Sequence, residues 1–200
     1  MKYLELLRRI KEPIFSIQDL KLMGYKVVNS RLSYLAKKEH ILKLKNGLYL
    51  LEDKKDLAIP ENIAFRLYGP SYISLEWALQ AYGLIPEIVY NVTSITTKTT
   101  RRFRNTFGLF IYKKIRTNLF WGYKKEEKNN QNYLIAEPEK ALLDYIYFNL
   151  SKIKNSFDLK ELRLNSESLK ILNWEKITEY LKIFNNQGIN KIIEEIRCSL

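Results

Sequence analysis

A helix over about residues 29–39 would present on one face the side chains best suited to contact nucleic acid. Arginine can donate two hydrogen bonds to guanine, asparagine can pair with adenine, and serine hydroxyls and lysines can bind phosphate oxygens. The same helix would turn Leu32, Leu35 and Ala36 towards a core. The outward residues, which we predict to bind DNA, are Asn29, Ser30, Arg31, Ser33, Tyr34 and Lys37.

A basic hairpin is predicted directly after this helix. Leu42 and Leu44 alternate with Lys43 and Lys45, so that one strand face is apolar and the other cationic. Asn46-Gly47 is a strong signal for a two-residue turn of type I′, in which both residues have positive φ. We therefore expect Lys43, Lys45 and Asn46 to reach the DNA backbone.

Two further helices are predicted upstream of these elements. Residues 3–11 carry apolar side chains at helical spacing and are followed by a proline. Ser16 can cap a second helix, with Asp19 in its first turn and Gly24 at its end. Helices followed by a basic hairpin are typical of a winged helix-turn-helix domain, whose third helix enters the major groove. We predict such a domain over residues 1–55.

The composition agrees with a polyanionic partner. The chain of 200 residues has 34 Lys and Arg against 22 Asp and Glu, and residues 1–55 hold 13 of these cations with only 6 acids. One cysteine, Cys198, and one histidine, His40, exclude an internal disulfide and a Cys/His zinc site. Without a membrane span of about 18 apolar residues or a secretory signal, we expect a cytoplasmic protein.

The remainder, residues 56–200, is predicted to be a mixed α/β domain with a helical C-terminal tail, which makes the whole chain α+β. The sequence contains no phosphate loop, nucleophile elbow or dinucleotide fingerprint. We expect helices over 61–68, after Ser74 and after Pro138, strands in 88–97, 103–115 and 133–136, and tail helices centred on 169–181 and 189–196.

Two groups of charged residues admit an enzymatic interpretation. Glu137, Glu139, Lys140 and Asp144 could act catalytically, but at the start of a helix they fit helix-end electrostatics and a Lys140–Asp144 salt bridge better. Glu126-Glu127-Lys128 is the carboxylate–lysine pattern of a metal-dependent nuclease, although we expect it in a loop without an upstream aspartate.

A second basic stretch runs from residue 96 to 116 and contains no acid. Phenylalanines are interleaved with its cations, as in a strand with a buried face and a solvated face. The alternative is a second surface for an anionic partner, either the same DNA or RNA. Its cations are Lys98, Arg101, Arg102, Arg104, Lys113, Lys114 and Arg116.

Three blocks of sequence resemble one family. They are the hairpin ending in Asn46-Gly47-Leu48-Tyr49, the Ser-Leu-x-x-Ala-Leu block of residues 74–79 before Gly83-Leu84-Ile85-Pro86, and the Ala-Glu-Pro-Glu-Lys-Ala-Leu-Leu-Asp block of residues 136–144. Over roughly residues 1–150 the chain is similar to the AbiEi-type antitoxins of type IV toxin–antitoxin (abortive infection) systems. In that family an arginine often stands where this chain has Asn46.

The resemblance implies an autorepressor that binds inverted repeats in its own promoter. Its second domain would counteract a nucleotidyltransferase toxin encoded beside it, without a stable complex of the two proteins. We therefore expect a DNA-binding transcription regulator and antitoxin that is not an enzyme and needs neither cofactor nor metal. A metal-dependent nuclease targeted by a winged helix is the alternative, and a pure protein-interaction module a third. The oligomeric state is left open.

Overall fold

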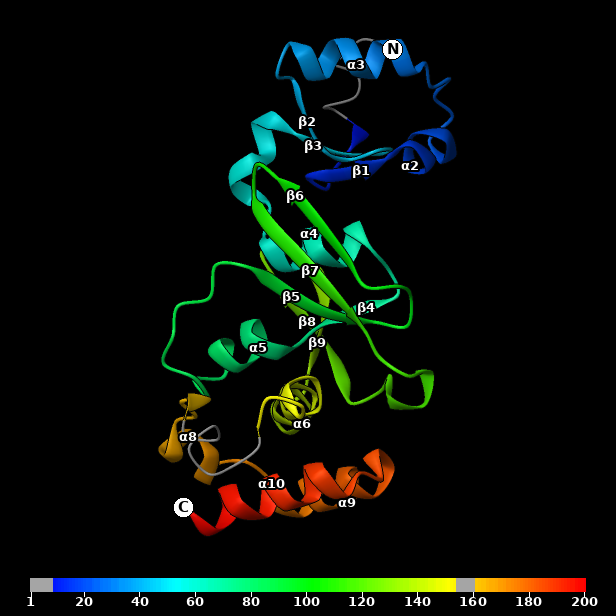
Figure 1. The fold of residues 1–200 in the computed structure, drawn as a ribbon. Coiled ribbons are helices and arrows are strands. Elements are labelled where there is room, and N and C mark those ends of the chain that lie inside the picture. The colour runs from blue at the N-terminus through cyan, green and yellow to red at the C-terminus, as the bar shows by residue number, and fades with distance from the viewer. Residues whose placement is uncertain (1–8, 154–160) are drawn as a thin grey trace.

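The structure, a computed structural model, describes residues 9–153 and 161–200. Over these residues the chain is α+β, as expected, with helices packed on β-sheets (Figure 1). The helix expected over residues 3–11 lies mostly outside the described residues. Helix α3 is at one end of the molecule and helices α9 and α10 are at the other (Figure 1).

The N-terminal elements form a small antiparallel sheet with helix α3 packed across it. Its strands follow the order β1-β3-β2, and β3 is buried along its whole length. In chain order the elements are β1 (Ile14–Ser16), α2 (Ile17–Leu22), α3 (Asn29–Lys37), β2 (Ile41–Lys45) and β3 (Leu48–Leu51).

The local signals for the first helices are confirmed. Ser16 caps α2, because its Oγ accepts a hydrogen bond from the Asp19 amide at 3.0 Å while its own amide donates to the Asp19 carboxylate at 2.7 Å. Gly24 follows α2 with a φ of +81°, the left-handed conformation that favours glycine after a helix. In α3, Leu32 and Leu35 are buried as predicted.

The hairpin between β2 and β3 forms, but its turn is not of type I′. Gly47 has a φ of +79°, whereas Asn46 does not have the positive φ that this turn requires. The ladder shifts by one residue between Lys43 and Lys45, which indicates a β-bulge. The bulge changes the alternation of β2, so that Ile41 and Leu44 are buried while Leu42 is only partly buried.

The larger sheet has the strand order β6-β7-β5-β4-β9-β8. The pairs β4–β9 and β5–β7 are parallel, and the remaining pairs are antiparallel. The elements of this part are η1 (Glu52–Leu57), α4 (Pro60–Leu67), β4 (Ser71–Ile73), α5 (Leu75–Ala81), β5 (Val92–Thr96), β6 (Arg101–Asn105), β7 (Gly108–Lys114), η2 (Thr117–Leu119), β8 (Tyr123–Lys128), β9 (Gln131–Ala136) and α6 (Pro138–Asn149).

Helices cover both faces of this sheet. Tyr112 of β7 donates a hydrogen bond to the Ala64 carbonyl of α4 at 2.6 Å, so α4 lies on the face to which Tyr112 points. Tyr72 of β4 is two strands away in the ladder and points to the opposite face, where its hydroxyl donates to Asp144 of α6 at 3.0 Å. Helix α5 packs beside α6 on that second face.

Two of the strand expectations need correction. The run 103–115 is not one strand but the β6–β7 hairpin. The triplet Glu126–Lys128 lies in strand β8 and not in a loop, and the turn follows it at Asn129-Asn130, where both residues have positive φ. Strand β8 is an edge strand whose lysines and glutamates are mostly exposed, so it lacks the apolar alternation that identifies a strand in a sequence.

The C-terminal helices are α8 (Ser166–Lys170), α9 (Trp174–Phe184) and α10 (Gln187–Cys198), and it is α9 and α10 that contact α6. The helix expected around 169–181 is divided into α8 and α9, because Asn173 leaves the helical conformation and its side chain caps α9 by accepting from the Lys176 amide at 3.0 Å.

The small sheet is buried on both faces. On the α3 side lie Phe15, Tyr49 and Leu51, in a cluster with the buried leucines of α3. On the other side Ile14, Leu44, Leu48 and Leu50 belong to the same buried cluster as α4 and the larger sheet. The expected boundary near residue 55 falls in η1, but the residues on its two sides share a core.

A fully buried ion pair joins α6 to the larger sheet. Lys140 and Asp144 are both 0% exposed, and their side chains form the salt bridge predicted from the i,i+4 spacing. Asp144 also accepts hydrogen bonds from the hydroxyls of Tyr72 at 3.0 Å and Ser74 at 2.9 Å. The ammonium of Lys140 lies 5.1 Å from the ring centroid of Trp121. Burial raises the pKa of Asp144 and lowers that of Lys140, and their pairing opposes both effects.

Removing one partner of this pair should strongly destabilise the fold. In Asp144→Ala the buried ammonium has no counter-charge, so we expect the free energy of unfolding to fall by about 3–5 kcal/mol in urea denaturation. The control is Lys140→Met combined with Asp144→Leu, which deletes both charges. It should be less destabilising than Asp144→Ala, and an equal or larger loss would show that the unpaired charge is not the cause.

Candidate nucleic-acid interface

The outer face of α3 is exposed and contains no acid. All of the predicted DNA-binding residues on it are exposed, and Tyr34 is 57% exposed. Arg31 and Lys37 form no ion pair with any residue in the described ranges. Since the small sheet covers the inner face of α3 and α3 lies at one end of the molecule, this outer face points away from the rest of the chain (Figure 1).

Exposed apolar side chains precede α3 in the chain. Leu22 and Met23 at the end of α2 are 81% and 41% exposed, and Val28 just before α3 is 49% exposed. The exposure of these side chains was not predicted from the sequence, because an apolar residue such as Met23 at the end of a helix is expected to face the core. Val28 is the residue before Asn29, and an apolar side chain at that position can contact a thymine methyl group in a major groove.

The residues expected to bind DNA from the hairpin differ in their surroundings. Lys43 and Asn46 are exposed. Lys45 is partly buried, and its ammonium donates a hydrogen bond to the Leu67 carbonyl at the end of α4. Burial lowers the pKa of Lys45, and repulsion by Lys98 and Arg101 adds to this effect. Lys45 therefore attaches the hairpin to α4 and does not project freely from the turn.

A cleft of about 870 Å³ lies between α2, the tip of the hairpin and α4. Lys21, Lys45 and Asn46 line it. Asp19 and Arg66 also line it and join α2 to α4 through a salt bridge of 2.5 Å. Burial acts to raise the pKa of Asp19, but hydrogen bonds from Ser16 and the charge of Arg66 lower it overall.

The cations of the second basic stretch do not form one surface. Arg101 pairs with Tyr112 across the β6–β7 ladder and so lies on the α4 face. Arg102 and Arg104 alternate to the opposite face, which also carries Lys113, whose ammonium is 5.3 Å from the ring centroid of Phe148 in α6. Lys98, Lys114 and Arg116 are exposed in or next to the flanking loops. None of the seven cations forms an ion pair within residues 9–153 and 161–200.

Strands β2 and β6, each at an edge of its own sheet, lie side by side (Figure 1). The α4-facing side of β6 is therefore next to the basic hairpin. This proximity between the two predicted cationic regions could not be seen in the sequence, since 50 or more residues separate them.

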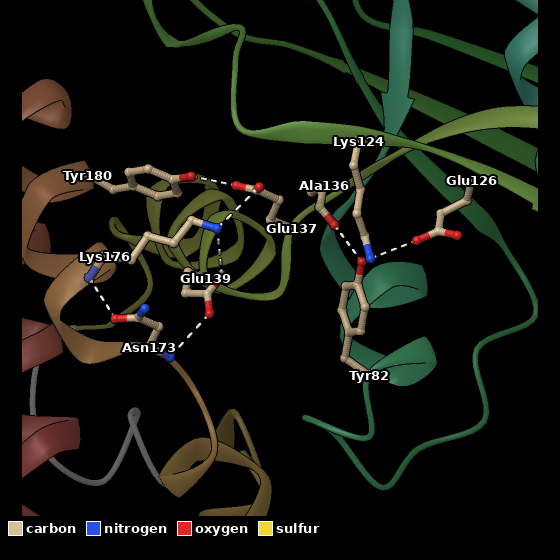
Figure 2. Close-up of polar contacts among 9 residues, drawn as sticks. All are labelled: Tyr82, Lys124, Glu126, Ala136, Glu137, Glu139, Asn173, Lys176 and Tyr180. Carbon is tan, nitrogen blue, oxygen red and sulfur yellow. Dashed lines mark hydrogen bonds and ion pairs between the residues drawn. The ribbon is translucent and has the colours of Figure 1, made fainter.

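Glu137 and Glu139, at the start of α6, form hydrogen bonds and ion pairs with residues of α9 and its cap (Figure 2). The Tyr180 hydroxyl donates a hydrogen bond to Glu137. The Lys176 ammonium lies 3.1 Å from Glu137 and 3.6 Å from Glu139. Glu139 also accepts from the Asn173 amide at 3.1 Å. These contacts dock α9 on α6, which agrees with the structural interpretation of this cluster.

A second polar group in Figure 2 involves the nuclease-like triplet. Glu126 pairs with Lys124 at 2.6 Å, and Lys128 is 3.8 Å from Glu61 of α4. Near the Lys124–Glu126 pair, Tyr82 donates to the Ala136 carbonyl at 2.8 Å, and burial raises the Tyr82 pKa. Within the described parts of the chain, no three His, Cys, Asp or Glu side chains are grouped so that they could hold a metal ion.

Comparison with known proteins adds no assignment: no family model and no curated protein matches this chain. In the described residues, no helix has the length and apolar character needed to cross a membrane.

The docking of α9 should depend on pH through Glu137. Burial acts to raise the pKa of Glu137, but hydrogen bonds from Tyr180 and Lys176 bring it below its ordinary value of 4.5. A depressed pKa in the folded state means that this stabilisation is complete above about pH 4.5 and is lost as the pH falls through the folded pKa. Trp121, whose ring lies 4.6 Å from that of Tyr180, should report the loss by a change in fluorescence.

Glu137→Gln should weaken this low-pH transition, because glutamine does not titrate. Glu179→Gln is the matched control, since Glu179 lies on α9, is exposed and forms no ion pair with the described residues. Identical acid transitions in the two variants would contradict the assignment to Glu137.

Proposed function

We propose that this chain is a DNA-binding transcriptional repressor of the AbiEi antitoxin type, with a winged helix-turn-helix domain over residues 1–55. The observation that carries the proposal is the outer face of α3, which is exposed, free of acids and equipped with Arg31, Asn29 and serine hydroxyls. It regulates its own toxin–antitoxin operon and counteracts a nucleotidyltransferase toxin.

The chemistry of this face suits the reading of bases. The guanidinium of Arg31 forms no ion pair with the described residues, so its two parallel N–H groups can bind guanine O6 and N7. Asn29 and the serines lie in the first half of the helix, the part that contacts base edges in helix-turn-helix complexes. Lys37 and Lys43 are exposed and add phosphate contacts.

The packing of α3 on the small sheet also supports sequence-specific binding. Leu32 and Leu35 fix α3 on the small sheet, and the other side of that sheet is packed against α4. A rigidly supported helix keeps its side chains in register with the bases and loses little conformational entropy on binding. This support explains how a helix of nine residues can serve as a reading element.

The antitoxin part of the proposal rests on the sequence resemblance and on unpaired charge in the second part of the chain. Arg102 and Arg104 are exposed on the β6 face opposite α4, with no acid paired to them in the described residues. Unpaired arginines present forked donors to phosphates or carboxylates. We therefore assign the working surface for toxin neutralisation to this face.

DNA binding should discriminate between sequences and should also depend on the salt concentration. The full-length chain should shift duplex DNA from its own promoter, with an affinity that falls steeply as salt rises. Arg31→Ala should lose about 1–3 kcal/mol of discrimination at one base position, whereas Lys43→Ala should weaken binding to all sequences alike. Mobility-shift titrations at several salt concentrations measure both effects.

Lys125→Ala is the control for these titrations, because Lys125 is an exposed lysine on the distant strand β8. The proposal fails if the wild-type chain binds no promoter DNA at low salt. Cleavage of the DNA in the presence of a divalent metal would instead favour a nuclease.

Protection against the toxin should be separable from repression. In cells that co-express the toxin encoded beside this gene, Arg102→Glu with Arg104→Glu should reduce survival, because charge reversal repels an anionic partner. Arg31→Ala should relieve repression of a promoter reporter and leave protection intact. Circular dichroism checks that each variant is folded, and full protection by the reversed variant would place the antitoxic surface elsewhere.

A further inference from the structure

Three cations from separate segments meet at the carboxyl end of α4. Lys45 comes from β2, Lys98 from the loop between β5 and β6, and Arg101 from the first position of β6. Two of them lie over the ring of Tyr68: the Lys98 ammonium is 5.5 Å and the Arg101 guanidinium carbon 5.9 Å from its centroid. No carboxylate among the described residues forms an ion pair with any of the three.

Contacts within the fold set the position of each cation but leave donors free. Lys45 donates to the Leu67 carbonyl, and Lys98 donates to the Gly69 carbonyl at 2.6 Å. An ammonium has three N–H groups, so two remain on each lysine. Arg101 lies over the ring of Phe103 at 5.6 Å and forms no hydrogen bond or ion pair with the described residues, so its donors are free.

The grouping is electrostatically unfavourable without a ligand. Like charges this close repel, and the repulsion by Lys98 and Arg101 contributes, after burial, to the lowered pKa of Lys45. The carbonyl oxygens at the end of α4 offset part of the repulsion, because the C-terminal end of a helix carries partial negative charge. A negatively charged ligand would offset the rest.

We propose that Lys45, Lys98 and Arg101 form a binding site for a phosphate group. A phosphate offers several acceptor oxygens to a forked guanidinium and two ammonium groups, and Arg is favoured where planar two-point contact with an oxyanion is made. The phosphate is either a free or terminal phosphate or a backbone phosphate of nucleic acid. Because Lys45 belongs to the hairpin and the other two to the larger sheet region, the ligand would bridge these parts. The site does not depend on the proposed DNA-reading face of α3.

Thermal unfolding of the full-length chain tests the site directly. Inorganic pyrophosphate, compared with chloride at equal ionic strength, should raise Tm by about 3–6 °C at ten times its dissociation constant. Arg101→Ala and Lys98→Ala should abolish the rise. Arg101→Lys should retain part of the rise in Tm, because lysine keeps the positive charge but lacks the planar guanidinium that makes a two-point contact.

Lys125→Ala is the control, because Lys125 is an exposed cation on β8, at the edge of the larger sheet opposite to β6. It should respond to pyrophosphate like the wild type. Circular dichroism and the Tm in chloride identify any variant that does not fold, and the exposed Arg101 is the substitution least expected to unfold the chain.

A second measurement distinguishes the two sources of phosphate. If the ligand is a nucleic-acid backbone, Arg101→Ala should lower the affinity for all duplexes and reduce the salt dependence of binding by about one phosphate contact. Lys125→Ala should change neither. A rise in Tm with unchanged duplex affinity would indicate a free or terminal phosphate. The proposal is overturned if Arg101→Ala and Lys125→Ala behave alike in both measurements. Failure of promoter recognition by α3 would leave the Tm result unaffected, so the two proposals can fail separately.

Discussion

The buried pair of Lys140 and Asp144 is the interaction on which the arrangement of the second part depends. Two charges at 0% exposure are compatible with a stable fold only if each is neutralised and hydrogen-bonded. Tyr72 and Ser74 meet this condition from β4, and the rings of Trp121 and Phe184 close around the ammonium. The pair thus fixes α6 against β4 and α9 against α6. The two sequence blocks of residues 74–79 and 136–144 meet here, which gives them a structural role.

Acids in the contacts nearer the surface are also paired with cations. With α6 held in place, Glu137 and Glu139 face α9 and are neutralised by Lys176. On the other face of the sheet α4 supports the small sheet, whose far side supports α3. Acids in these contacts are matched by nearby cations, whereas Arg31 on α3 and Arg102 on β6 have no acidic partner among the described residues. The excess positive charge is therefore found on the surfaces proposed to bind anions.

Local signals in the sequence predicted those features whose causes are local. The cap of α2 by Ser16, the buried face of α3 and the Lys140–Asp144 spacing all depend on residues within four positions of one another. Features that depend on distant partners were not predicted. Strand β8 exists because β9 pairs with it. Ser74, just before α5, accepts no capping hydrogen bond from that helix, and its hydroxyl donates to Asp144 of α6.

For the same reason, the number of cations in a stretch of sequence does not tell how many of them are available at the candidate interface. Residues 1–55 carry an excess of cations, but several of these are used inside the protein. Lys45 holds the hairpin on α4, and Lys54 donates to the Ile10 carbonyl at 2.7 Å. What remains for DNA is Arg31, Lys37 and Lys43 together with their exposed lysine neighbours. Because the charges of Lys98 and Arg101 act on Lys45, the cations on the two sides of the boundary near residue 55 influence one another. The two proposed binding surfaces, on α3 and at the β2–β6 edge, therefore belong to one folded unit, in which the core that supports α3 also determines which cations reach the solvent.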